Sequence, residues 1–250
     1  MKIFFFDDEK LFGRDNVCRV YGRPTLVPDS IYSDGVISTD YGSLSVLRCD
    51  DGKYRMIYMG RAIETGEMGC FMAISDDGVH FTPENVAAKV DLPGRLFNHE
   101  LLKLSPEAEI GTVIEDRLAP PAERYKMLVC DGDFGALRIK TPLYVSPDLY
   151  HWSRVPDVEW GGGNEPLAGA FYNEHRGCYT IIRRPFWGVR RAGYSETTDW
   201  RTYSEFTPCI QCDAVDEPLA EIYGMPSFAY EGVYIGFVHL YAGHASAHNA

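Results

Sequence analysis

The sequence has no long apolar run and few positive charges. No stretch approaches the roughly 18 consecutive apolar residues that a membrane-spanning helix needs, and the short apolar run at positions 3–6 is too brief for a secretory signal. The 24 lysines and arginines are outnumbered by 36 aspartates and glutamates, which gives a formal net charge of -12. Because an acidic chain repels a phosphate backbone, we expect no nucleic-acid partner. From the missing apolar runs we expect no membrane partner and a cytoplasmic location.

The cysteines do not define a disulfide framework or a clear metal site, and nucleotide-binding signatures are absent. The 7 cysteines are an odd number spread along the chain, which favours reduced thiols over a disulfide framework. Cys209 and Cys212 form a lone C-x-x-C, and zinc binding there is an alternative that needs the distant histidines at positions 239, 244 and 248. The sequence has no P-loop, no dinucleotide-binding glycine pattern and no Gly-x-Ser-x-Gly elbow. We therefore predict no metal and no cofactor.

The sequence does contain an internal repeat, with the composition of short strands and turns. Aromatic residues make up 13% of the chain, which also has 24 glycines and 15 prolines. The matching segments are 51–59 with 71–81, 123–129 with 143–152, 176–182 with 192–200, and 230–238 without a second half. Each copy predicts a strand and then a second strand that runs into a Ser-x-Asp-x-x-x-Trp/Phe turn, with serines at 75, 146 and 195. Trp152 and Trp200 are assigned to the aromatic position of that turn.

This repeat predicts an all-β protein in which similar antiparallel sheets pack radially as the blades of a β-propeller. No segment has the pattern of an amphipathic helix, and the glutamate-rich residues 103–123 are expected to form a surface insertion in the second unit. We predict a single β-propeller domain over residues 1–250, incomplete because about three and a half units are recognisable. If this chain does not close the ring, a homo-oligomer is the expected way to cover the open sheet edges.

Several segments resemble the five-bladed β-propeller glycoside hydrolases, the group that contains families 32, 43, 62, 68 and 130. Within that group the resemblance is to glycosyl hydrolases with a family-32-like amino-terminal domain. The segments with the more particular matches are Gly163-Asn164-Glu165-Pro166, Arg183-Arg184-Pro185 and Tyr223-Gly224-Met225-Pro226. The resemblance implies a five-bladed propeller that cleaves a glycosidic bond of an oligo- or polysaccharide, so a carbohydrate is the expected partner. The Trp-Met-Asn-Asp-Pro signature of the sucrose-cleaving members is absent.

Four segments that precede the repeated strands each carry a carboxylate, and a propeller would bring them to one mouth of its central channel. These carboxylates are Asp34, Glu100, Glu165 and Glu221. Glycosidic cleavage needs two carboxyl groups, about 5–5.5 Å apart for retention of configuration or roughly 6.5–9.5 Å apart for inversion. The resemblance implies Asp34 as the base or nucleophile and Glu165 as the acid, with Glu221 as a third catalytic candidate. Glu100 and its neighbour His99 are candidates for substrate binding.

Arg183 and Arg184 begin a second candidate region for substrate binding. Because neighbouring residues on a strand face opposite ways, only one of the two can point at a substrate. Trp187 and Trp160 are candidates to stack on sugar rings. Two more arginines follow at positions 190 and 191, so inorganic phosphate is an alternative nucleophile, and the protein would then be a glycoside phosphorylase. A non-catalytic carbohydrate-binding or assembly module is the other alternative that these residues leave open.

Overall fold

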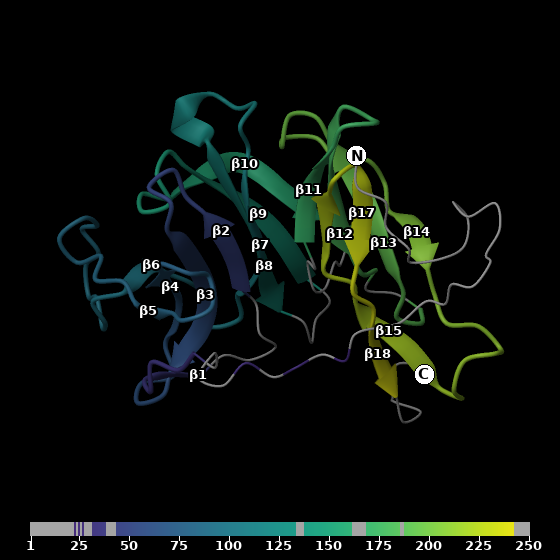
Figure 1. Ribbon diagram of the computed structural model, residues 1–250, viewed down its shortest axis with the longest axis horizontal. Helices are drawn as coiled ribbons and strands as arrows, with labels where there is room; N and C mark the ends of the chain where they lie inside the picture. The colour runs from purple at the N-terminus through teal and green to yellow at the C-terminus, as the bar shows by residue number, and fades with distance from the viewer. Residues whose placement is uncertain are drawn as a thin grey trace, which may run out of the picture.

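The described part of the chain is built from β-strands. The computed structural model describes residues 23, 25, 27, 32–38, 44–133, 138–161, 169–185 and 188–242. These residues form eighteen strands and one short 3₁₀ turn, η1 (Pro121–Glu123), as Figure 1 shows. The prediction of an all-β protein is confirmed. None of the helical segments among the described residues is long and apolar enough to cross a membrane.

The strands form three antiparallel sheets, here called blades 1 to 3, and a fourth strand group. Blade 1 contains β2 (Leu44–Arg48), β3 (Tyr54–Ala62) and β4 (Met68–Ser75), with the short strands β1 (Ile37–Ser38), β5 (Thr82–Pro83) and β6 (Glu100–Lys103) paired to them. Blade 2 is the meander β7 (Glu109–Glu115), β8 (Tyr125–Asp133), β9 (Arg138–Ser146) and β10 (Ser153–Gly161). Blade 3 is the meander β11 (Gly169–Asn173), β12 (Cys178–Arg183), β13 (Ala192–Thr197) and β14 (Thr207–Ile210).

The fourth group continues the repeat after blade 3. In it, β15 (Ala220–Gly224) pairs with β18 (His239–Ala242), and β16 (Ser227–Tyr230) forms a hairpin with β17 (Val233–Gly236). The two turn residues of the hairpin, Glu231 and Gly232, both have positive φ angles, +50° and +81°. Two successive positive φ angles define the tight turn whose twist matches that of an antiparallel hairpin. The predicted fourth copy at 230–238 therefore contains this hairpin turn and β17, and the strand group begins before it, with β15 and β16.

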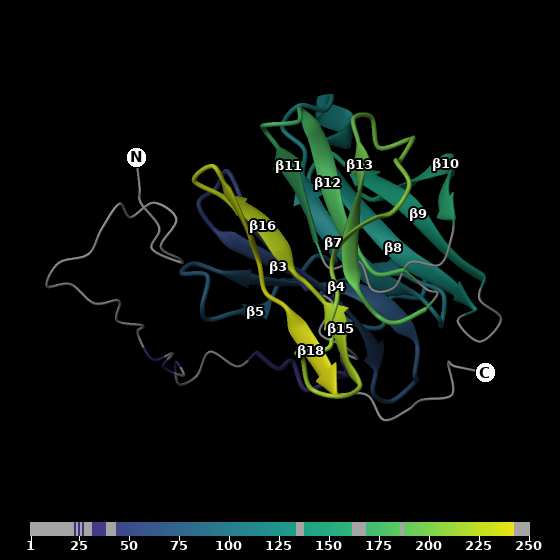
Figure 2. The same ribbon diagram turned by 90° about the vertical axis from the view of Figure 1, so that its right-hand side faces the viewer.

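The sheets follow one another radially. One strand of each sheet lies beside one strand of the next, so that β2 neighbours β7, β7 neighbours β11 and β11 neighbours β16. Figures 1 and 2 show the sheets side by side. The tyrosine-containing segments of the repeat are the strands β3, β8, β12 and β17. Each is the second strand from the centre of its sheet, whereas the sequence predicted the innermost strand. This radial order is that of propeller blades, in which each sheet covers the apolar face of its neighbour.

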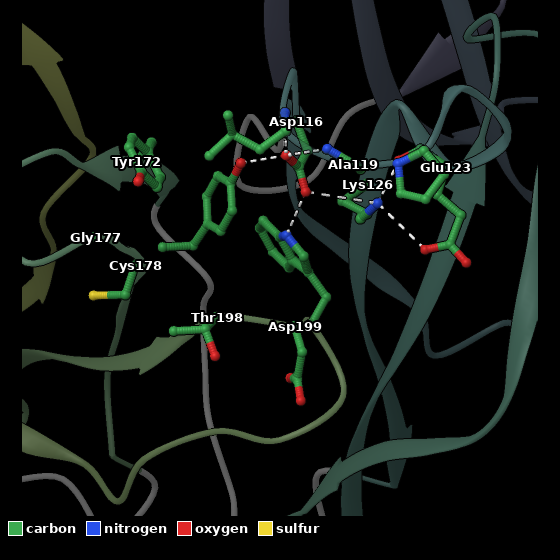
Figure 3. Close-up of a pocket in the computed structure, with 13 residues that line it drawn as sticks. Asp116, Ala119, Glu123, Lys126, Tyr172, Gly177, Cys178, Thr198 and Asp199 are labelled. Atoms are coloured by element: carbon green, nitrogen blue, oxygen red, sulfur yellow. Dashed lines mark hydrogen bonds and ion pairs between the residues drawn. The ribbon is translucent and has the colours of Figure 1, made fainter.

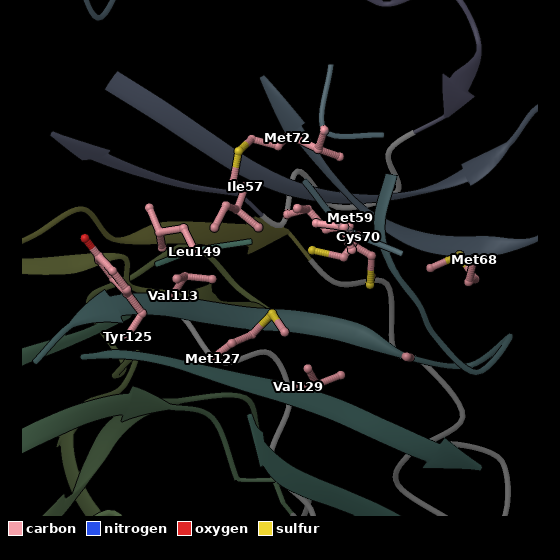
Figure 4. Packing of buried hydrophobic residues seen from close by; sticks show 14 residues of the cluster. Ile57, Met59, Met68, Cys70, Met72, Val113, Tyr125, Met127, Val129 and Leu149 are labelled. Carbon is pink, nitrogen blue, oxygen red and sulfur yellow. The ribbon is translucent and has the colours of Figure 1, made fainter. Parts of the chain in front are cut away.

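Apolar side chains fill the interfaces between the blades. Ile57 and Met72 of blade 1 pack against Met127 and Val113 of blade 2, and all four are buried (Figure 4). A second cluster joins Leu128 and Leu143 of blade 2 to Tyr179, Ile181 and Trp200 of blade 3. Burial of one such aliphatic side chain contributes roughly 1.5–3 kcal/mol, so the interfaces are the main source of cohesion between sheets.

The repeated turn is present in all three blades, with one register corrected. The hydroxyl that accepts two backbone N–H groups of the turn belongs to Ser75 in blade 1, Ser146 in blade 2 and Thr197 in blade 3. Thr197 Oγ1 accepts the N–H of Asp199 at 3.3 Å and of Trp200 at 2.9 Å. The assignment of Ser195 to this position is wrong by two residues, because threonine supplies the same acceptor oxygen as serine.

The shift also changes the role of Trp200. Trp200 stands at the third position after the hydroxyl, where blades 1 and 2 have Gly78 and Leu149, and all three residues have positive φ angles. Tyr203 takes the aromatic position of the turn and donates its hydroxyl to the Trp200 carbonyl at 3.1 Å. In blade 2 the Nε1–H of Trp152 donates to the Leu149 carbonyl in the same way, at 2.8 Å. Trp152 is therefore the turn aromatic as predicted, whereas Trp200 is not.

The expected surface insertion at residues 103–123 is also corrected. Residues 109–115 form β7, the first strand of blade 2, and this strand pairs with β8. Val113 is buried between blades 1 and 2, and its backbone N–H donates to Ser45 Oγ of blade 1 at 2.9 Å. The glutamates suggested an exposed loop, but an alternating strand buries one set of its side chains and leaves the other accessible.

Candidate active site

Asp34 lies in a turn that leads into β1. Its Oδ1 accepts the backbone N–H groups of Val36 at 3.0 Å and Ile37 at 2.9 Å, and Gly35 between them has a φ angle of +74°. Aspartate commonly stabilises a turn by accepting the backbone N–H groups of the residues two and three positions later. The turn holds the carboxylate against blade 1.

The second carboxylate oxygen of Asp34 joins side chains from three segments. Oδ2 accepts the hydroxyl of Tyr58 on β3 at 2.6 Å and lies 3.1 Å from Nε2 of His99, which immediately precedes β6. The hydroxyls of Tyr58 and Tyr32 are 2.9 Å apart. The Asp34 side chain is only 3% exposed and that of His99 is 8% exposed. Two of the predicted site residues, 65 positions apart, therefore meet in one buried cluster.

The surroundings keep Asp34 ionised. Burial alone would raise its pKa, but the hydrogen bonds from Tyr58, the two backbone N–H groups and His99 outweigh burial and hold the pKa of Asp34 below its ordinary value. Burial, with the hydrogen bond to Asp34, raises the pKa of Tyr58, and burial raises the pKa of Tyr32 to about 12. Because an ionised carboxylate only accepts hydrogen bonds, Nε2 of His99 is the donor in this contact.

Aromatic rings fix the orientation of His99. Its ring centroid lies 5.4 Å from that of Phe71, 5.8 Å from that of Phe97 and 6.4 Å from that of Tyr58. Packed rings on several sides leave the imidazole few alternative rotamers. Sequence reasoning selected Asp34 and His99 but missed Tyr32 and Tyr58. The signal for Tyr58 was present, since it is a second tyrosine four residues after the one that marks the repeat.

Glu100 points away from the Asp34 cluster and closes a loop. Its Oε2 accepts the backbone N–H of Leu96 at 2.7 Å, and its Oε1 lies 3.9 Å from Lys103 Nζ. The side chain is buried by these contacts. Binding of substrate by Glu100 remains a prediction, and its contacts with Leu96 and Lys103 give it a local structural role.

Glu221 on β15 is paired with an arginine. Its Oε2 lies 2.5 Å from Nη1 of Arg190, and its Oε1 lies 3.4 Å from the Arg190 backbone nitrogen. Arg184 donates from Nη1 to the Tyr223 carbonyl at 3.0 Å and lies over the ring of the same tyrosine. Glu221 and the arginine segment, predicted separately, therefore lie together.

Arg183 and Arg184 face different neighbours, as strand alternation predicts. The Arg183 guanidinium lies 5.4 Å from the ring centroid of Phe206, whereas that of Arg184 lies 4.7 Å from the ring centroid of Tyr223. Burial lowers the pKa of Arg183 to about 10. Two predicted residues, Glu165 and Trp187, lie outside the described residues, as does the side chain of Trp160, whose backbone belongs to β10.

No group of three or more histidine, cysteine, aspartate and glutamate side chains in the described part of the chain is arranged to hold a metal ion. Cys209 and Cys212 are both free thiols in this structure. His244 and His248, which the zinc alternative required, lie outside the described residues.

A cavity of about 220 Å³ lies between blades 2 and 3 (Figure 3). In it, Asp116 Oδ2 accepts the Nε1–H of Trp200 at 2.9 Å, and its Oδ1 accepts the hydroxyl of Tyr179. Lys126 Nζ lies 3.7 Å from Asp116 Oδ2 and 3.4 Å from Glu123 Oε2. Sequence reasoning missed this network. Since its members already satisfy one another, we assign it to the cohesion of the two blades.

Comparison with known proteins shows the fold. The sequence matches no protein-family model, and no curated protein matches it. Its structure is similar to that of an N-acetylgalactosamine deacetylase from F. plautii, solved in complex with blood group B trisaccharide, with 13% identity, a TM-score of 0.55, and coverage of 88% of this chain and 66% of that chain. It is also similar to the family 32 β-fructofuranosidase of Bombyx mori, with 16% identity, a TM-score of 0.50, and coverage of 79% of this chain and 42% of that chain.

The chain therefore has the blade architecture of the β-propeller glycoside hydrolases, and the resemblance stated from the sequence is confirmed at the level of the fold. This chain spans about two thirds of the deacetylase chain and less than half of the fructofuranosidase chain. A shared fold does not define a reaction, so the activities of those proteins enter below as proposals.

Proposed function

We propose that this chain is a carbohydrate-active hydrolase domain that cleaves a glycosidic bond with Asp34 as its ionised carboxylate. The observation that carries the proposal is the buried Asp34 cluster, in which four hydrogen bonds stabilise the charged form of one carboxylate. A glycosidic transition state resembles an oxocarbenium ion, and a carboxylate held ionised beside it stabilises its positive charge or attacks it as a nucleophile. The fold, shared with enzymes that act on sugars, supports this reading.

The second carboxyl group of the reaction is Glu165 by resemblance. Among the other predicted carboxylates, Glu221 is held by Arg190, and Glu100 closes its own loop. Both contacts make these two side chains less available to protonate a leaving group. Asp34 supplies the negative charge, which Tyr58 and His99 hold in place through its Oδ2.

Hydrolysis of a panel of aryl glycosides and oligosaccharides tests this function. Asp34→Asn should lower kcat/KM by about a hundredfold or more, because the amide has no negative charge to offer the transition state. Asp77→Asn is a matched control, since Asp77 Oδ1 also accepts N–H groups two and three residues on, in an exposed turn of blade 1. Full activity of Asp34→Asn would disprove the proposal. Turnover only in the presence of phosphate would favour the phosphorylase, and sugar binding without turnover would favour the binding module.

Removal of an acetyl group from an N-acetylated sugar is a second candidate function, and the Asp34–His99 pair favours it. A carboxylate that accepts Nε2–H orients an imidazole so that Nδ1 can take a proton from water as it attacks a carbonyl carbon. The similar structure with the TM-score of 0.55 is that of a sugar deacetylase. The test uses N-acetylgalactosamine glycosides as substrates. If the wild type releases acetate but no aglycone, and His99→Gln releases no acetate, the reaction is deacetylation and not glycosidic cleavage.

A further inference from the structure

Two arginines from the segment between β12 and β13 stack on two tyrosines, one from β15 and one from β18. Arg184 lies with its guanidinium carbon 4.7 Å from the ring centroid of Tyr223, and that of Arg190 lies 5.1 Å from the ring centroid of Tyr241. The two tyrosine rings are 5.7 Å apart, so the four side chains form one continuous group, here called the Arg–Tyr platform. Stacking uses the flat face of a guanidinium and leaves its N–H groups for hydrogen bonds in the plane. Arg184 is buried and donates to the Tyr223 carbonyl, whereas Arg190 is partly exposed.

The strand register explains why these groups share one face. Glu221 is directly opposite Tyr241 on β18, and residues opposite each other across an antiparallel pair point to the same side of a sheet. The register shifts between Ile222 and Gly224, so Tyr223 lies at a bulge, and its ring contact with Tyr241 places it beside this group. The backbone fixes Arg190 to the same place, since its carbonyl accepts the Ile222 N–H at 3.1 Å. The platform is therefore built by paired strands and not by a loop alone.

Arg190 is held in position but not enclosed. Glu221 engages Nη1 of its guanidinium, and in the described part of the chain no other carboxylate forms an ion pair with Arg190. The side chains of Arg190 and Glu221 are 23% and 22% exposed, and Tyr241 is 39% exposed. A guanidinium offers a second edge, formed by Nε and the other terminal nitrogen, that matches a carboxylate in a bidentate fork. Contact with Glu221 orients this edge before a ligand arrives.

We propose that the Arg–Tyr platform is a subsite for the carboxylate of an acidic sugar, with Arg190 binding the carboxylate and the exposed Tyr241 ring stacking on the pyranose. Substrates with a uronic acid residue are the class selected, and this rests on the proposed action on carbohydrates. β15 and β18 lie at the lower end of the molecule in Figure 1, as does β1, which follows Asp34. An aromatic ring beside a fixed positive charge distinguishes an acidic sugar from both a neutral sugar and a free inorganic anion.

Binding to the inactive Asp34→Asn protein tests the subsite separately from turnover. The ligands are galacturonate and glucuronate, the neutral sugars galactose and glucose, and inorganic phosphate, each titrated by calorimetry or by ligand-observed NMR. We expect the uronates to bind at least about tenfold more tightly than the neutral sugars, and this preference to be lost in Arg190→Gln and reduced in Arg184→Gln. Arg190→Lys should also lose most of the preference, because an ammonium group cannot form the fork.

Arg176→Gln is the matched control, since Arg176 is an exposed arginine of blade 3 in an ion pair with Glu196. It should leave uronate binding unchanged. Equal binding of uronate and neutral sugars, or equal weakening by Arg176→Gln, would overturn the subsite. If phosphate binds more tightly than the uronates, and this binding is lost in Arg190→Gln, the ligand of the platform is a free inorganic anion and not a sugar carboxylate. If the wild type shows no turnover but uronate binding still depends on Arg190, the proposed hydrolase function fails and the subsite stands.

Discussion

Replacing Asp116 by alanine tests how strongly one buried carboxylate links blades 2 and 3. Its Oδ1 accepts the backbone N–H groups of Leu118 and Ala119, both at 3.0 Å, in addition to the Tyr179 hydroxyl. Its Oδ2 accepts the Trp200 indole N–H at 2.9 Å, from a residue 84 positions later in the chain. Alanine removes the acceptor for all four donors at once, and two of them belong to the neighbouring blade.

The expected cost follows from what is left unpaired. Lys126, whose side chain is 1% exposed, lies 3.7 Å from Asp116, and burial lowers the pKa of this lysine although Asp116 and Glu123 oppose the shift. Breaking one partner of a buried charge pair costs about 3–5 kcal/mol. We therefore expect Asp116→Ala to lower the free energy of unfolding by about 3–5 kcal/mol. The double variant Asp116→Ala with Lys126→Met should recover part of this loss, because it also removes a buried positive charge that is left with Glu123 as its remaining ion-pair partner.

Urea unfolding followed by tryptophan fluorescence and far-ultraviolet circular dichroism measures these differences. Asp77→Ala is the control, because Asp77 forms the same kind of turn with an exposed side chain in blade 1. It should cost only about 1 kcal/mol, the usual value of a local cap. A loss in Asp116→Ala no larger than that in Asp77→Ala, or a double variant less stable than Asp116→Ala, would refute the reasoning about a charged link between blades.

Three other predictions concern single groups. Tyr58→Phe removes a hydrogen bond that lowers the pKa of Asp34, so the acidic limb of the kcat/KM profile should move to higher pH, and an unmoved limb would show that Asp34 does not control it. Gly169 has a φ angle of +139°, and Gly169→Ala places a Cβ about 3.0 Å from a backbone oxygen of β16. This variant should lower the free energy of unfolding by about 2–4 kcal/mol, measured by thermal or urea unfolding. Gly177→Ala, with open space around it, should cost only about 1 kcal/mol. His151 has a raised pKa, because it donates to a neighbouring carboxylate, so its stabilising effect should be full below pH 6.5 and disappear as pH rises through the raised pKa. Unfolding of His151→Gln and the wild type across that range would show converging stabilities, and a constant difference would contradict the assignment.

Local chemistry made several elements predictable. The repeated turn needs a hydroxyl acceptor followed two residues later by an aspartate, and the hairpin turn at Glu231-Gly232 needs positive φ angles, so short sequence patterns identify both. The register of blade 3 was misplaced because the serine at 195 was matched to the serines at 75 and 146, although Thr197 is the hydroxyl residue with an aspartate two positions later. The strand at 109–115 was missed because its burial depends on the neighbouring blade.

The candidate site likewise has features that the sequence predicts and features that only the tertiary structure determines. The recurrence of carboxylates before the repeated strands is visible in the sequence itself. That Arg183 and Arg184 contact different rings is what the strand period predicts for adjacent residues. That Asp34 meets His99 across 65 residues, while the adjacent Glu100 turns into its own loop, depends on how β1 and β6 join blade 1. The pairing of Glu221 with Arg190 likewise depends on where the fourth strand group lies against blade 3. Contacts between distant segments are set by the rotation of one sheet relative to the next, and no property of the separate segments encodes that rotation.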